Sequence, residues 1–142
     1  YVGLTNPMPT PSQETEAAPH RHLAESNPFP FFYRMELILG SLAERGIELD
    51  RIRVVPFFID DLSQNAAFVP ADALHLLSEC DNWQREKLRM LRTAGLRAEF
   101  AISQPKTITG TEVRRRLRAN ERVDNLVPNF VARYLAEHPH PL

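Results

Sequence analysis

The chain has 142 residues, of which 43% are hydrophobic and 25% charged, and its formal net charge is −1. This length suits one domain, and this composition is that of an ordinary soluble globular protein. The mixing of acidic and basic residues argues against a broad nucleic-acid-binding surface, and no stretch is apolar enough to cross a membrane. The single Cys80 cannot form an internal disulfide, so we expect a cytoplasmic protein that binds neither nucleic acid nor membrane.

The first residues read as a short strand already in progress, followed by a long loop. Tyr1 and Val2 favour a strand, and a domain rarely opens on a buried strand, so we expect a β-α unit before Tyr1 in the native protein. Residues 6–30 are polar and rich in proline, which prevents regular helices and ladders, so we expect a long loop that is functional or disordered. Within it, His20 and His22 fit solvated side chains better than a metal site, because no further ligand stands at a recognised spacing.

Helical and strand patterns alternate through the rest of the chain. Apolar residues recur at helical spacing from Phe31 to Arg45, and Gly46 supplies a C-cap. A second helix is expected after Asp81 or Asn82, either of which can cap it, and it should stop near Gly95. A closing helix is expected over residues 129–137, and strands are expected over residues 52–59, 73–77 and 96–102. A lone histidine inside a strand is most often structural, which is the role we expect for His75.

This alternation predicts an α/β fold over residues 1–142 as a single domain. Its sheet should be parallel, with helices on both faces in the doubly wound arrangement. In such a fold the turns that follow the strands meet at one edge of the sheet, where ligands gather. We therefore expect four turns to converge into one site: Thr5-Asn6, Asp60-Asp61, Asp81-Asn82 and Thr109-Gly110-Thr111.

Residues 106–117 have the pattern of an anion site at a helix N terminus. Thr109 or Thr111 can cap the helix, and Gly110 lets backbone N–H groups approach a ligand closely. The free N–H groups and the helix dipole favour a phosphate there, and Arg114 lies one turn inside, where its planar fork can reach the same anion. An ordinary capped surface helix with an exposed basic face is the alternative that the local pattern leaves open.

The same residues carry a family resemblance. The run from Ile108 to Arg114 resembles the Ile-Ser-x-Thr-x-x-Arg signature of the nucleotidylyltransferase superfamily, in particular of nicotinamide-nucleotide adenylyltransferases, with threonine where serine is usual. Residues 27–34 resemble that family's Asn-Pro-Phe-Thr-x-x-Glu-Arg segment, with Tyr33 in place of the acid, and residues 123–128 resemble its Leu-Val-Pro segment. The resemblance implies a Rossmann-like fold of the HUP type.

The resemblance also implies roles for individual side chains. Arg34 and Arg114 would act in catalysis by contacting the nucleotide phosphates. Further phosphate-binding and nucleotide-binding positions would be Thr109, Gly110, Thr111, Asp81, Asn82 and Trp83. Trp83 could equally cover the core. Acceptor-binding positions would be Thr5, Asn6, Asp60 and Phe68.

The implied reaction is adenylyl transfer from ATP to the phosphate of nicotinamide mononucleotide, with release of pyrophosphate and with Mg²⁺ carried on the nucleotide phosphates. Cytidylyl transfer from CTP to a small phosphate or phosphonate is the alternative, because related domains share the scaffold. The family's His-x-Gly-His motif does not occur in this chain. Either it precedes Tyr1, or the domain is a non-catalytic nucleotide-binding module. A flavodoxin-like fold of unrelated function is a third alternative. Family members often assemble, so a homo-oligomer is also an expectation.

Overall fold

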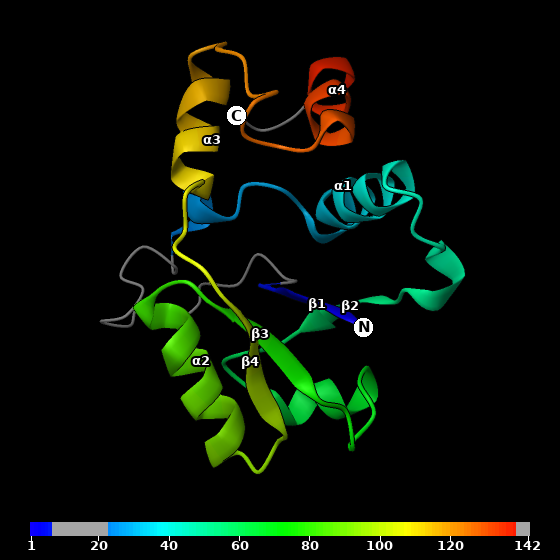
Figure 1. The fold of residues 1–142 in the computed structure, drawn as a ribbon, viewed down its shortest axis with the longest axis vertical. Helices are drawn as coiled ribbons and strands as arrows, with labels where there is room; N and C mark the ends of the chain where they lie inside the picture. The colour runs from blue at the N-terminus through cyan, green and yellow to red at the C-terminus, as the bar shows by residue number, and fades with distance from the viewer. Residues whose placement is uncertain (7–22, 139–142) are drawn as a thin grey trace.

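The computed structural model describes residues 1–6 and 23–138, so the histidine pair and most of the proline-rich segment lie outside the described residues (Figure 1). The strands are β1 (Val2–Thr5), β2 (Val54–Phe57), β3 (His75–Glu79) and β4 (Ala98–Ser103). The α-helices are α1 (Phe31–Glu44), α2 (Asn82–Thr93), α3 (Gly110–Arg118) and α4 (Asn129–Glu137). Short 3-10 helices are η1 (Ala24–Ser26), η2 (Leu49–Arg51) and η3 (Leu62–Ala67).

The α/β character of the prediction is confirmed, but the strands form two parallel pairs instead of one continuous sheet. Within the described part of the chain, β1 pairs with β2 from Val2↔Val54 to Thr5↔Phe57. The second pair, β3 with β4, runs from His75↔Ala98 to Glu79↔Ser103, with a register shift after Leu77. The physical reason is that no described strand forms backbone hydrogen bonds to both pairs, and the two pairs meet through side chains, with the ring of Phe57 in β2 lying 5.8 Å from that of His75 in β3.

Local chemistry sets the strand ends. The strand expected over residues 52–59 is shorter, because Phe58 leaves the ladder and bonds instead to the side chain of Asn65. Pro56 lies within β2, which it tolerates because this strand is paired on one edge only. The predicted helix ends are confirmed by Gly46 and Gly95, whose positive φ angles of 74° and 78° suit the residue that follows a helix.

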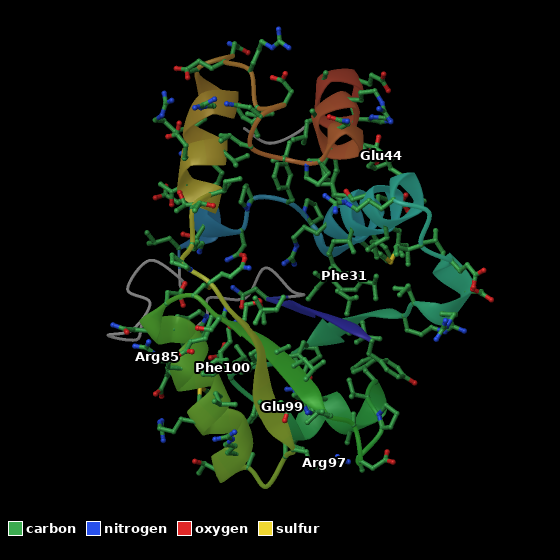
Figure 2. All side chains as sticks on the ribbon, in the orientation of Figure 1. Phe31, Glu44, Arg85, Arg97, Glu99 and Phe100 are labelled. Carbon is green, nitrogen blue, oxygen red and sulfur yellow. The ribbon has the colours of Figure 1, made fainter. Side chains whose placement is uncertain are left out.

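Helices α1 and α4 pack closely against each other, as Figure 1 shows. Gly40 makes this approach possible, because a Cβ atom at that position would overlap the ring of Phe130. Glu44 at the end of α1 accepts a hydrogen bond from the backbone N–H of Phe130 at 2.9 Å and pairs with Arg133 at 3.1 Å, and it lies beside α4 in Figure 2. The carboxylate therefore satisfies an otherwise unpaired N–H in the first turn of α4.

Helix α2 covers the β3–β4 pair (Figure 1). Leu91 of α2 and Ala98 of β4 are both buried, and the Arg92 Nε donates to the Ala98 carbonyl at 3.0 Å. Nδ1 of His75 lies 3.2 Å from the Arg97 carbonyl, and the structural role expected for this histidine stays a prediction. None of the helices within residues 1–6 and 23–138 is long and apolar enough to cross a membrane.

Candidate functional site

The N terminus of α3 is built as the sequence predicts. Thr109, and not Thr111, is the N-cap, and its Oγ1 accepts a hydrogen bond from the Glu112 N–H at 3.2 Å. Thr111 lies in the first turn, where its Oγ1 accepts from Nη2 of Arg114 at 3.3 Å. A Cβ atom at Gly110 would stand 3.0 Å from Nη1 of Arg114. The glycine therefore also leaves space for the guanidinium group to fold back over the helix end.

A cavity of about 540 Å³ opens between α3 and η1. Nη1 of Arg114 donates to the Ser26 carbonyl at 3.2 Å, which joins the two segments although 88 positions separate them, and Figure 1 shows η1 beside the start of α3. The cavity is lined by Leu23, Glu25, Ser26, Thr111, Arg114, Arg115, Arg118 and Ala119. We call this space the α3 pocket. Its hydroxyl and guanidinium groups suit the oxygens of a phosphate chain.

The four arginines of the basic run divide into two groups. Arg115 binds Glu112 at 2.9 Å and Glu121 at 2.8 Å, and Arg116 binds Glu112 at 2.8 Å. These two guanidinium groups are balanced by carboxylates of the protein, although Arg115 also reaches the rim of the α3 pocket. Arg114 and Arg118 line the pocket, and within the described part of the chain neither forms an ion pair with a carboxylate, so they supply the positive charge of the pocket.

Charges around the pocket shift several pKa values. Burial, and then the nearby Arg118, lower the pKa of Arg114, while Glu25 opposes the shift. Arginine nevertheless stays charged, because its ordinary pKa is above 12. Hydrogen bonds from Arg115 and Arg116 lower the pKa of Glu112 to about 2. The first turn of α3 is thus held by a carboxylate that remains ionised at neutral pH.

Arg34 lies at a second location, the carboxyl end of β1. Its Nη1 donates to the Thr5 carbonyl at 2.7 Å and its Nη2 donates to the Asn6 carbonyl at 2.6 Å. Asn6 has a positive φ of 51°. The Nε of Arg34 is buried without a hydrogen-bond partner in the described structure, and burial lowers the pKa of the guanidinium. The structure therefore brings Arg34, Thr5 and Asn6 together.

A third cluster surrounds the start of α2. Asp81 is the N-cap, since its Oδ1 accepts from the Gln84 N–H at 2.9 Å, and its Oδ2 lies 3.7 Å from Nζ of Lys106. Trp83 is half-buried, and Nζ of Lys87 stands 5.5 Å from the centre of its ring. Asn82 is exposed at the first position of the helix. Lys106 thus links the helix that follows β3 to the segment that leads into α3.

Glu79 is the last residue of β3, close in the chain to the cluster at the start of α2, and the sequence analysis did not single it out. Its carboxylate accepts from Ser103 Oγ at 3.0 Å and from Arg85 Nε at 3.1 Å, and these hydrogen bonds lower its pKa. Figure 2 places Arg85 near the start of α2. The alternation of apolar and polar residues in β3 could have indicated that Glu79 ends the strand as an outward-facing acid. The sequence could not show that Ser103 of β4 is its partner, because 24 positions separate the two residues.

The turn after β2 is organised by Asn65, a second residue that the sequence did not reveal. This side chain is 4% exposed, and it bonds both backbone groups of Phe58, accepting at 2.8 Å and donating at 3.1 Å. Asp61 caps η3, and Asp60 is exposed. Phe68 is 40% exposed, with its ring 6.1 Å from that of Phe58. An acceptor-binding role for Asp60 and Phe68 stays a prediction.

The structure thus groups the predicted residues into local clusters, and their convergence into one site stays a prediction. Among the residues that the structure describes, no group of three or more histidine, cysteine, aspartate or glutamate side chains could hold a metal ion. An α/β domain with a cationic cavity that runs along a helix from its first turn, where a hydroxyl group lines it, has the features of a nucleotide-binding protein.

Comparison with known proteins makes this class specific. Over 137 residues, 96% of the chain, the sequence is 36% identical to a phosphonoformate cytidylyltransferase of Streptomyces viridochromogenes, and the match spans 74% of that protein. No protein-family model and no solved structure matches the chain. The chain belongs to the nucleotidylyltransferases, and it is a nucleotidyltransferase enzyme. The narrower resemblance to nicotinamide-nucleotide adenylyltransferases is not confirmed.

Proposed function

We propose that the protein is a cytidylyltransferase that moves CMP from CTP to a small phosphonate or phosphate acceptor. The observation that carries the proposal is the α3 pocket, where Thr111 in the first turn of α3 and Arg114 and Arg118 further along it lie on one face of the helix. The relative is a phosphonoformate cytidylyltransferase, which favours CTP and a phosphonate over the ATP and nicotinamide mononucleotide that the motifs suggested first. Transfer from ATP is kept as the second candidate because of those motifs.

In the proposed reaction, a phosphonate oxygen of the acceptor attacks the α-phosphorus of CTP. A new P–O bond forms, the bond from that phosphorus to the bridging oxygen breaks, and pyrophosphate leaves with the electron pair. Such a transfer needs positioning and neutralisation of growing negative charge, and it needs no protein nucleophile. Arg114, Arg118 and the N–H groups of α3 would bind the leaving pyrophosphate, and the Thr111 hydroxyl would donate to one of its oxygens.

Magnesium is proposed to enter with the nucleotide. The α3 pocket is lined by hydroxyl groups, by guanidinium groups, which bind phosphate oxygens and not a cation, and by the single carboxylate of Glu25, which is too few protein ligands for a magnesium site of its own. The ion would therefore be held by the triphosphate itself, where it would offset negative charge on the leaving group.

The other turns complete the proposal. Asp81, Asn82 and Trp83 would lie near the sugar and base of the nucleotide. The acceptor would bind where β1 and β2 end, near Thr5, Asn6, Asp60 and Phe68.

The finer fold is also a proposal. The two parallel pairs would be halves of one Rossmann-like sheet. Each of the four strands has one edge to which no described strand bonds, and the family resemblance implies a further strand, which we place between β1 and β3. The relative is longer than the matched region, which leaves room for such a segment. The family's His-x-Gly-His motif would lie on it. The gene sequence upstream of Tyr1 tests this point.

Pyrophosphate release by the full-length protein tests the function. CTP and ATP are each offered with phosphonoformate, nicotinamide mononucleotide and inorganic phosphate in the presence of Mg²⁺. We expect release with CTP and phosphonoformate above all other pairs. Release with ATP and nicotinamide mononucleotide alone would support the second candidate. CTP binding without release from any pair would identify a non-catalytic nucleotide-binding module.

A further inference from the structure

The guanidinium group of Arg34 joins α1 to the end of β1. Its two terminal nitrogens lie 2.7 Å and 2.6 Å from the carbonyl oxygens of Thr5 and Asn6, which precede it by 29 and 28 positions. These distances are short for N–H···O bonds, as expected when the donor is charged. One rigid side chain thus holds two successive peptide groups at the strand exit.

The backbone that Arg34 holds has an unfavourable conformation. Thr5 forms the last pair of the β1–β2 ladder, and the next residue, Asn6, has a φ of 51°. A residue with a Cβ atom adopts this left-handed region at an energetic cost, which the surrounding structure has to offset. The two hydrogen bonds from Arg34 act on the carbonyls on either side of the Asn6 N–Cα bond, so they stabilise this turn directly.

The side chain of Arg34 starts from a fixed base. It lies in the first turn of α1, where its backbone N–H donates to the Pro30 carbonyl at 3.1 Å. It is half-buried, and its Nε is fully covered. The helix itself is held against α4 through Gly40. A side chain on a packed helix fixes a neighbouring loop more precisely than one on another loop would.

Arg34 and Arg114 therefore differ in what they hold. Arg114 lines the α3 pocket, and its two hydrogen bonds there are longer, at 3.2 Å and 3.3 Å. Arg34 is not among the residues that line that pocket, and both of its terminal nitrogens bind backbone carbonyls. We propose that Arg34 is a positioning residue that fixes the Thr5-Asn6 exit of β1 in the conformation that binds the acceptor, while Arg114 serves the triphosphate. This inference rests on the proposed function, and it replaces a direct contact between Arg34 and the nucleotide phosphates.

Arg34→Lys in the full-length protein tests the inference, because a single ammonium group cannot bind two carbonyls in the same geometry. We expect the KM for phosphonoformate to rise about 10-fold or more, as for loss of one charge-assisted hydrogen bond, and the Kd for CTP to stay within about twofold. Arg53→Lys is the matched control. Nη1 of Arg53 also donates to two carbonyls, those of Asp50 at 2.7 Å and Ile52 at 2.9 Å, but within its own turn and on the surface. The control should leave both constants unchanged.

Two substitutions of Asn6 test the same idea at the backbone that Arg34 holds. In the Arg34→Lys background, Asn6→Gly should lower the raised KM for the acceptor part of the way back to that of the unmodified protein. The reason is that glycine adopts a positive φ without support from other residues. Asn6→Ala alone should raise the acceptor KM with CTP binding intact, because alanine tolerates this conformation less well than asparagine. This variant keeps the inference testable if Arg34→Lys does not fold.

The outcomes separate the inference from the function on which it rests. A fall in CTP affinity of Arg34→Lys that equals or exceeds the change in acceptor KM would overturn the positioning role in favour of direct phosphate contact. Unchanged constants in both Arg34→Lys and Asn6→Ala would overturn it as well. An unmodified protein that binds CTP but transfers nothing would instead remove the proposed function, and the inference with it.

Discussion

Replacement of Arg114 with alanine tests the α3 pocket most directly. The guanidinium group of Arg114 makes two long hydrogen bonds, at 3.2 Å to the Ser26 carbonyl and at 3.3 Å to Thr111 Oγ1. Bonds of this length are near the limit of good geometry, so their loss should cost the fold little. With CTP bound, the same group would make charge-assisted hydrogen bonds to phosphate, each of which contributes about 1.5 to 3 kcal/mol. Loss of one such bond corresponds to a Kd for CTP that is about 10- to 150-fold higher.

Equilibrium dialysis with labelled CTP measures this change, and urea denaturation checks that the variant is folded. Arg89→Ala is the matched control, because Arg89 is an exposed arginine of α2 that pairs with Glu86 and is not among the residues lining the pocket. It removes the same charge from the protein and should leave CTP binding within about twofold, as expected for an exposed ion pair. An unchanged Kd in Arg114→Ala, or an equal change in Arg89→Ala, would refute the assigned role.

Three further predictions concern the pocket and the fold. Glu25→Gln removes a negative charge that faces the pocket, so the Kd for CTP should fall about two- to fivefold in low salt, and a rise in dialysis would contradict the electrostatic argument. Gly40→Ala should lower the free energy of unfolding by about 1 to 3 kcal/mol, because the new methyl group overlaps the Phe130 ring. Urea denaturation measures it, and Phe130→Leu in the same background should recover part of the loss. Glu112→Gln should be less stable than the parent at neutral pH. Because the pKa of Glu112 falls from 4.5 unfolded to about 2 folded, this difference should vanish as the pH drops through that window, and a difference independent of pH would contradict it.

Features that depend on neighbouring residues were predictable from the sequence. The α1 helix ends before a glycine in the left-handed region, α2 starts at its Asp81 cap, and the closing helix has the bounds that its apolar spacing indicates. The N terminus of α3 follows the same logic, with Thr109 as the cap. Caps, turns and helical periodicity act within four or five positions, so a linear pattern contains the information that decides them.

Features that depend on distant residues were decided by the tertiary structure. In the sequence the four arginines of α3 look equivalent. Only the fold shows that Glu121 pairs with Arg115 and that η1 contacts Arg114. Asn65 and Glu79 looked unremarkable because their partners lie on other segments. Arg34 was expected at a phosphate, and its contacts with the end of β1 span the proline-rich segment. Local chemistry thus determined which helices form and where a phosphate could be held. The closure of long loops and the pairing of strands decided which charges remain for a ligand, because both depend on contacts that no short stretch of sequence contains.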